Sequence, residues 1–344
     1  MAAAVSYTEG AMPDPPENPD TPAPTPDEAD TLSNGDLQPT HAFEPVTFSR
    51  IGTKIGAFTL KRIIGSGGMG TVYEAMQEQP RRRVAVKMIK RGITSKSALR
   101  RFEFESQLLG RLQHPGIAQV YEAGTHDDGS GGVPYFAMEY IANAKSLTQY
   151  AQEKKLGTRE RLALFAKVCD AVQHGHLKGI VHRDLKPENI LIGQFGEICL
   201  IDWGVAKIWG MPNEERNPEQ KDRGEQLTAT GQRPGTPLYM SPEQIVGSYY
   251  VDQRTDVYSA GVVLYEILCL DVPFMGKNIH GTFDMVIHDQ PLLPSQKNPR
   301  RKIPSPLEVI CMKALEKDPA KRQPSISELI AQIQEFQQHQ KLIS

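Results

Sequence analysis

The chain has few cysteines: only four among 344 residues, with no CxxC pair. Cys169, Cys199, Cys269 and Cys311 are far apart, and each stands among apolar residues. Structural zinc sites and disulfide frameworks need closely spaced or paired cysteines, so neither is expected to organise this fold. We therefore expect four buried, reduced thiols in a cytoplasmic protein.

Lysine and arginine are absent from the first 49 positions, which carry nine acidic side chains. A secretory signal needs a basic segment followed by an apolar stretch, and this N-terminus has neither. The segment is also rich in proline, as in residues 13–16 and 21–26. Such a composition buries too little apolar surface to offset the entropy of ordering. We expect residues 1–50 to form a disordered, acidic, proline-rich tail.

Long apolar runs are also missing, because the longest, Ala260–Leu270, contains Glu266 and is too short to span a bilayer. The residues after the tail hold all 39 Lys and Arg but 32 of the 41 Asp and Glu, a formal charge of +7. A mildly basic domain suits an anionic ligand such as ATP, whereas nucleic-acid binding usually needs a clustered basic face. We expect a soluble protein without a membrane segment and without nucleic acid as a partner.

What the chain does contain is a strand-rich half followed by a helix-rich half. Alternating patterns predict strands over 58–64, 71–75, 83–89, 117–122 and 135–140, with a helix over 97–112 between the third and fourth. Helical spacing predicts helices over 158–178, 256–270, 306–315 and 325–338. The order indicates an α+β protein with two lobes, 51–140 and 141–344, joined near Glu139–Ile141, and ligands favour the cleft between such lobes.

The most informative stretch is the polar run His182–Asn189, which lies between apolar residues on both sides. Packing gives no reason for so many polar side chains there. Their order is that of a phosphotransferase catalytic loop, in which Asp184 is the base and Asn189, five residues on, is a magnesium ligand.

A glycine-rich segment, Gly65–Val72, has the pattern GxGxxG followed by valine. Glycines let backbone N–H groups approach phosphates. Dinucleotide-binding folds use the same glycines but continue into a helix, whereas here a strand pattern follows, which excludes a dinucleotide oxidoreductase. Lys87 lies 17 residues past Gly70 in an otherwise apolar strand, as expected of a lysine that holds the α- and β-phosphates. Its expected ion-pair partner is Glu105, with Glu103 as the alternative.

Asp202 leaves an apolar strand and is placed to hold Mg²⁺ together with Asn189. The usual residue after such an aspartate is phenylalanine, and Trp203 departs from that pattern. The stretch 207–234 then resembles an activation segment, closed by Gly235–Glu243. Phosphate on Thr228 or Thr230, or on Thr236, is a candidate regulatory switch, with Arg183 as the expected partner of Thr228 or Thr230. Asp256 is expected as a helix N-cap and Arg322 as a structural partner of Glu243.

Together these motifs resemble the eukaryotic-type (Hanks-type) serine/threonine protein kinases, from about Phe58 to about Glu335. Lys186 and Thr236 are typical of the serine/threonine class, and the sequence of Gly235–Gln244 is most similar to that of bacterial members. The resemblance implies the bilobal kinase fold, with a β-rich N-lobe and an α-helical C-lobe. It also implies transfer of the ATP γ-phosphate to Ser/Thr hydroxyls of proteins in signal transduction, with autophosphorylation of the activation segment.

The resemblance further implies a role for each matching residue. Asp184 accepts the hydroxyl proton, Lys186 steadies the γ-phosphate, and Lys87 with Glu105 positions the phosphates. Asn189 and Asp202 hold Mg²⁺, with Mn²⁺ as an alternative. The residues implied to bind ATP are Ile64, Gly65, Ser66, Gly67, Gly68, Met69, Gly70, Val72, Ala85, Lys87, Met138, Glu139, Tyr140, Ile141 and Leu191.

Two alternatives remain in view. A pseudokinase, a kinase-shaped binding module, predicts loss of Lys87, Asp184, Asn189 or Asp202, and all four are present, so Trp203 alone supports it. A small-molecule kinase typically lacks both the Lys-Pro-Glu run after Asp184 and the Gly235–Glu243 platform. A transient homodimer through the N-lobe is a further expectation from similar bacterial kinases.

Overall fold

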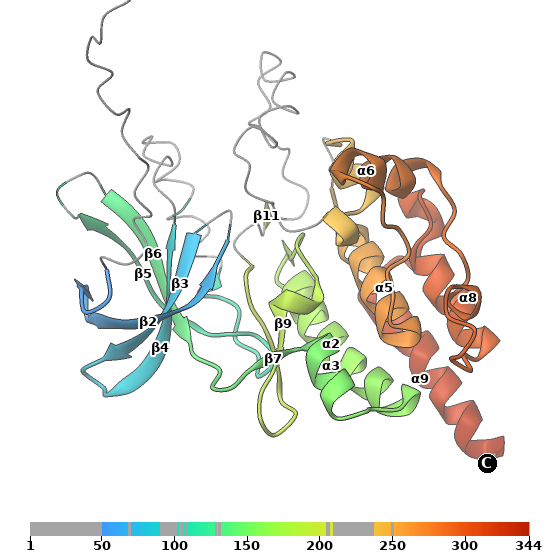
Figure 1. The fold of residues 1–344 in the computed structure, drawn as a ribbon, viewed down its shortest axis with the longest axis horizontal. Coiled ribbons are helices and arrows are strands. Elements are labelled where there is room, and N and C mark those ends of the chain that lie inside the picture. The colour runs from blue at the N-terminus through green and yellow to red at the C-terminus, as the bar shows by residue number, and fades with distance from the viewer. Residues whose placement is uncertain are drawn as a thin grey trace, which may run out of the picture. The chain divides into compact units, whose positions relative to one another are not determined.

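The computed structural model describes residues 50–67, 70–89, 102, 106–107, 109–127, 129, 132–203, 207–208, 237–248 and 251–343. All of them belong to one compact unit that begins at Phe48. Within this unit an antiparallel sheet precedes a helical part (Figure 1), which confirms the expected α+β class and the two lobes. The expected tail lies outside the described residues.

The N-terminal lobe is built on a six-stranded antiparallel sheet with the order β1-β2-β3-β4-β6-β5. Its strands are β1 (Lys54–Ile55), β2 (Phe58–Ser66), β3 (Gly70–Gln77), β4 (Arg82–Ile89), β5 (Val120–Asp127) and β6 (Gly132–Glu139).

Alternation along the strands gives this sheet two different faces. One face carries Tyr73, Val84 and Val86, which pack with other apolar residues into a small core of their own. Val72 pairs in register with Lys87, and Ala85 with Met138. Because paired residues project to the same side, these four side chains share the opposite face. The predicted nucleotide contacts of the sheet therefore lie together on one surface.

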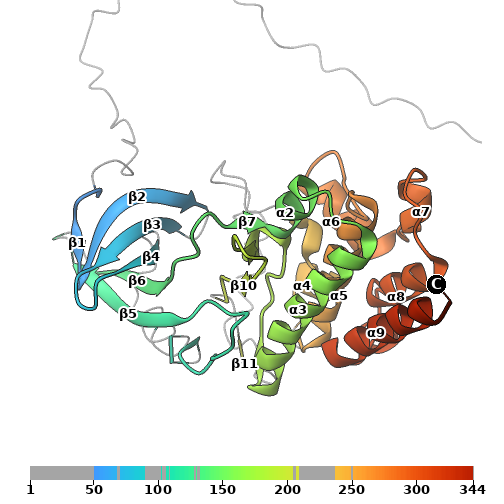
Figure 2. The same cartoon turned by 90° about the horizontal axis from the view of Figure 1, so that it is seen from below.

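The C-terminal lobe is helical (Figure 2) and contributes most residues of the larger core. Its central helix is α5 (Arg254–Cys269), in which all residues except Arg254 and Glu266 are buried, as expected of a helix surrounded by others. The remaining helices are α2 (Leu147–Glu153), α3 (Thr158–Leu177), α4 (Pro242–Ile245), α6 (Ile279–His288), α7 (Pro294–Lys297), α8 (Ser305–Ala314) and α9 (Ile326–Ile343), with short 3₁₀ turns η1 (Pro187–Asn189), η3 (Pro237–Tyr239) and η4 (Pro319–Lys321).

Two small sheets position the loops of the site. One has the order β10-β9-β7, formed by β7 (Lys145–Ser146), β9 (Ile190–Ile192) and β10 (Ile198–Leu200). The other pairs β8 (Ile180–Val181) with β11 (Lys207–Ile208). The segment before β5 joins the first of these, because Leu200 N donates to Gly116 O at 2.8 Å and Ala118 N to Leu200 O at 2.9 Å.

Most predicted elements are present with boundaries shifted by a few residues. The fourth strand was placed too early, since β5 runs from Val120 to Asp127. The helix expected over 97–112 lies mostly outside the described residues, although Phe102, Ser106, Gln107 and Leu109 are helical. Among the described residues, no helix combines the length and apolar character needed to cross a membrane.

Candidate active site

Asp184, in the loop between β8 and η1, is held in one orientation by Lys186 of the same loop and by Asn189 at the end of η1. Lys186 Nζ donates to both carboxylate oxygens, at 2.9 and 2.7 Å. Asn189 Nδ2 donates to Asp184 Oδ2 at 2.9 Å and to its backbone oxygen at 2.7 Å. Because the amide nitrogen of Asn189 is used in this way, its side-chain oxygen is the group left to receive a cation.

The backbone of this loop is fixed by Asp256 of α5, which is completely buried. Its carboxylate accepts hydrogen bonds from His182 N at 2.8 Å, Arg183 N at 2.9 Å and His176 Nε2 at 2.7 Å. Burial by itself raises the pKa of Asp256, but the hydrogen bond from His176 and the nearby histidines outweigh it, so the pKa lies below its ordinary value. Arg183 has a left-handed backbone, φ +66°, and these bonds hold it there.

The expectation that Asp256 is a helix N-cap is therefore wrong. The helix begins at Arg254 with Gln253 as its N-cap, so Asp256 lies inside the first turn and its carboxylate supports the catalytic loop instead.

Gln244 of α4 was missed by the sequence analysis. Its Nε2 donates to Arg183 O at 2.8 Å, while its Oε1 accepts from Ser241 N at 3.0 Å. One side chain thus joins the start of α4 to the catalytic loop. Burial lowers the pKa of Arg183, and the charge of Asp256 opposes that shift. The Nε of Arg183 is buried and has no hydrogen-bond partner within the part of the chain that the structure describes.

Asp202 follows β10 and lies beside the loop, because Ile201 N donates to Asn189 O at 3.0 Å. Its carboxylate forms an ion pair with Lys87 of β4, whose side chain is buried. This contact joins the sheet of the N-terminal lobe to the helical lobe. Glu105 and its alternative Glu103 lie outside the described residues, so the expected pairing of Lys87 with a helix glutamate stays a prediction.

The oxygen donors at this point suit a hard divalent cation. Asn189 offers a carbonyl oxygen and Asp202 a carboxylate, and Mg²⁺ prefers such ligands. The chemistry of the donor set therefore fits the metal that the sequence implies.

The glycine-rich turn contains two glycines with different roles. A Cβ atom at Gly70 would lie 2.1 Å from Met88 O, so this glycine lets β3 and β4 approach closely. A Cβ atom at Gly67 would meet no atom of the described residues within 4 Å, so this position borders open space in that part of the chain. Gly67 N donates to Gly70 O at 2.9 Å and closes the turn. Gly68 and Met69 lie outside the described residues.

The other predicted nucleotide contacts come from five strands and one connection. Ile64, Gly65 and Ser66 end β2; Val72 lies on β3; Ala85 and Lys87 lie on β4; Met138 and Glu139 end β6; Tyr140 and Ile141 follow it; and Leu191 lies on β9. Glu139 N donates to Gln119 O at 2.9 Å, which ties the end of β6 to the residue before β5.

The expected pair of Glu243 and Arg322 is confirmed. Both guanidinium Nη atoms donate to the two carboxylate oxygens, each at 2.7 Å. Burial by itself raises the pKa of Glu243, but the hydrogen bonds and charge of Arg322 lower it below its ordinary value. Thr255 Oγ1 also donates to Glu243 Oε1, at 2.7 Å, so the pair anchors α4 on α5. The candidate phosphorylation sites Thr228, Thr230 and Thr236 lie outside the described residues.

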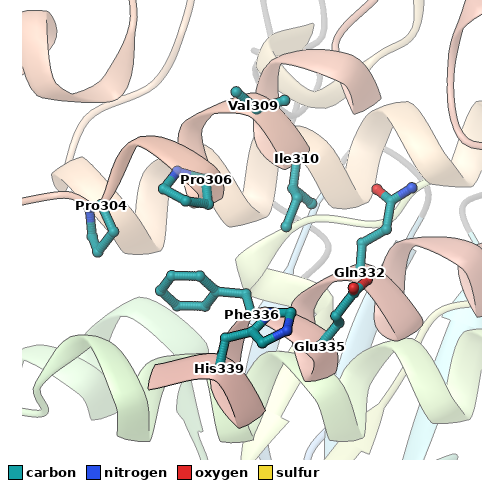
Figure 3. Close-up of a pocket in the computed structure, with 8 residues that line it drawn as sticks. All are labelled: Pro304, Pro306, Val309, Ile310, Gln332, Glu335, Phe336 and His339. Carbon is teal, nitrogen blue, oxygen red and sulfur yellow. The ribbon is translucent and has the colours of Figure 1, made fainter. Parts of the chain in front are cut away.

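A separate hollow of about 580 Å³ lies between α8 and α9, away from these residues (Figure 3). No predicted site residue lines it. Its lining residues are Pro304, Pro306, Val309, Ile310, Gln332, Glu335, Phe336 and His339.

Comparison with known proteins identifies the family to which the chain is similar. A model of the protein kinase domain matches residues 58–339. Serine/threonine-protein kinase PknD of Chlamydia trachomatis serovar D is 36% identical over 304 residues, which cover 82% of this chain and 32% of the relative. The PknD proteins of Chlamydia muridarum and Chlamydia pneumoniae are 35% and 34% identical, each match covering 79% of this chain and 30% of the relative. The chain spans about a third of the length of the curated relatives it matches.

Proposed function

The chain belongs to the protein kinase family, in its serine/threonine branch, and we propose that it transfers the γ-phosphate of ATP to serine and threonine hydroxyls of other proteins. The observation that carries the proposal is the grouping of Asp184, Lys186 and Asn189 in one hydrogen-bonded set, next to an Asp202 paired with Lys87. Phosphoryl transfer needs mainly positioning and neutralisation of charge, which such a set supplies.

The proposed base is Asp184. Lys186 and Asn189 fix its carboxylate, so that it orients the attacking hydroxyl and accepts the proton that leaves it. Lys186 lies beside this carboxylate and is placed to bind the transferring phosphate as well. Its positive charge offsets the charge that develops on the phosphoryl oxygens.

ATP and Mg²⁺ are the proposed cofactors, with Mn²⁺ as an alternative metal. Asn189 and Asp202 would hold the metal, which supplies neutralisation of the phosphate charge when it is bound. Lys87 would bind the α- and β-phosphates. The adenine would lie between Val72 and Ala85 on one side and Leu191 on the other, with its edge at the backbone of 139–141 and Met138 behind it. The open space at Gly67 supports a phosphate beneath the glycine-rich turn.

Regulation by phosphorylation is proposed for the segment that contains Thr228, Thr230 and Thr236. The half-buried Arg183, whose Nε has no partner among the described residues, supports this proposal because a phosphate is a strong acceptor for a guanidinium. Autophosphorylation, a role in signal transduction, a cytoplasmic location and a transient homodimer through the N-lobe are further proposals. The four free and buried cysteines are in keeping with the location.

The proposal is tested by incubating the purified protein with radiolabelled ATP and Mg²⁺, alone and with a generic basic protein substrate. We expect the wild type to incorporate label into its own chain and into the substrate. Incorporation should fall by at least about 100-fold in Asp184→Asn and in Lys87→Met. Asp284→Asn and Lys145→Met are matched controls, because both side chains are exposed and, within the described residues, each forms an ion pair with a neighbour on the surface. Mass spectrometry of the labelled chain then locates the phosphorylated threonines.

A wild-type protein that binds nucleotide in a thermal-shift assay but transfers no label would contradict the proposal. That outcome would favour a kinase-shaped binding module.

A further inference from the structure

Trp203, which stands where phenylalanine is usual, is part of the main core. It is 4% exposed, and its ring centroid lies 4.7 Å from that of His182, with the planes at 51°. The indole Nε1 is buried and has no hydrogen-bond partner among the described residues. The side chain therefore acts here through its shape and its packing.

Gly175 of α3 provides the space that the indole needs. A Cβ atom at this position would lie 2.4 Å from Cη2 and 2.5 Å from Cζ3 of Trp203, which is closer than carbon atoms can pack. Gly175 lies within the helix and has no positive φ, so its backbone does not require glycine. Glycine inside a helix is less favourable than alanine. Room for Trp203 is the reason that the structure offers for this unfavourable choice.

The indole is also connected directly to the site. Asp202, the residue before it, has a left-handed backbone with φ +67° and pairs with Lys87. His182, against which the indole packs, has its Nε2 3.2 Å from Ile201 O. Moving the indole would therefore move the backbone on which the Asp202 carboxylate depends.

We propose that Gly175 and Trp203 form a matched pair that positions Asp202, so that Gly175 is a positioning residue acting through the indole. The small residue on α3 compensates for the large residue after Asp202. This proposal rests on the proposed role of Asp202 as a metal ligand.

A double-mutant cycle tests the pair with Gly175→Ala, Trp203→Phe and the double variant. The readout is the Mg²⁺ concentration that half-saturates binding of a non-hydrolysable ATP analogue, measured by calorimetry. We expect Gly175→Ala to raise this concentration about tenfold or more, because the new methyl group displaces the indole. Adding Trp203→Phe should restore it to within about threefold of wild type. Because binding is measured without phosphoryl transfer, the cycle is informative even for a protein that lacks kinase activity.

Gly261→Ala is the matched control. This glycine lies in α5, and a Cβ atom at its position would come within 2.7 Å of Ala314 Cβ at the end of α8. It is far from Asp202 in the chain. It should lower the unfolding temperature without changing the Mg²⁺ requirement. The proposal is overturned if folded Gly175→Ala keeps the wild-type Mg²⁺ requirement, or if the double variant is no better than Gly175→Ala. If Gly175→Ala does not fold, the double variant must recover folding, and its failure to do so would also overturn the pair.

Discussion

Replacement of Asp256 by asparagine is the sharpest test of how the catalytic loop is held. One carboxylate oxygen accepts from both His176 Nε2 and His182 N, and the other accepts from Arg183 N. Asparagine has the same shape but only one acceptor oxygen, since the other group is an NH₂ donor. Whichever way the amide turns, at least one buried backbone N–H faces another N–H.

The magnitude follows from these contacts. A buried donor left without an acceptor costs about 1–3 kcal/mol, and loss of a hydrogen bond to a charged group costs about 1.5–3 kcal/mol. We therefore expect Asp256→Asn to lower the free energy of unfolding by about 3–5 kcal/mol, which is a large part of the roughly 5–15 kcal/mol typical of a domain. The phosphotransfer rate should fall as well, because Asp184 directly follows His182 and Arg183, at least one of whose backbone N–H groups loses its acceptor.

Urea unfolding of the wild type and the variant measures this difference directly. Asp252→Asn is the matched control: this aspartate precedes the same helix, is partly exposed and pairs with Arg254 two residues away. Such a pair contributes about 0–1 kcal/mol. A destabilisation of Asp256→Asn no larger than that of the control would refute the reasoning.

Three further outcomes are expected. Burial lowers the pKa of His182, and the charge of the nearby aspartates opposes that shift. As the pH falls, His182 therefore takes up a proton in the unfolded chain before it does so in the folded chain, and the free energy of unfolding should decrease below about pH 6.5. Denaturation at several pH values should show a weaker dependence of the unfolding free energy on pH in His182→Phe. Arg322→Lys should cost about 1–3 kcal/mol in thermal unfolding, because lysine cannot form the bidentate bonds to Glu243, and an unchanged midpoint would contradict this. Gly70→Ala should destabilise the sheet by about 1–3 kcal/mol. Gly67→Ala should leave the unfolding temperature unchanged and raise the KM for ATP, because a methyl group there enters open space. Equal effects of the two substitutions on stability would contradict this reasoning.

The residues proposed to carry the chemistry could be named from the sequence because phosphoryl transfer restricts their types and their order. A base, an amide ligand five residues later and an acidic residue after the next buried strand leave few alternatives at Asp184, Asn189 and Asp202. The sheet was predictable for a similar reason, since alternation in residues such as Val84–Met88 follows from one buried face.

The supporting contacts were not predictable, because they join residues that are far apart in the chain. Asp256 bonds to a backbone 74 residues earlier, and Gln244 to one 61 residues earlier. Periodicity reports only on neighbours within one element, so an aspartate near the start of a helix was interpreted as a cap. Likewise, nothing in the spacing of Gly175 indicates that its missing side chain makes room for an indole.

The departure at Trp203 is better understood as a change in packing than as a loss of catalytic function. In the proposed mechanism Asp184, Asn189 and Asp202 act through the charge or the hydrogen-bonding groups that they present, and no neighbour can replace those groups. Trp203 acts through its size, and a smaller neighbouring residue can accommodate a larger side chain, as the contact geometry at Gly175 indicates. A kinase-shaped binding module would be expected to lack one or more of these polar residues. It would also need no compensating change in the residues that pack against Trp203. Here the polar set is complete and the unusual side chain is accommodated, and this combination favours an active enzyme over a kinase-shaped binding module.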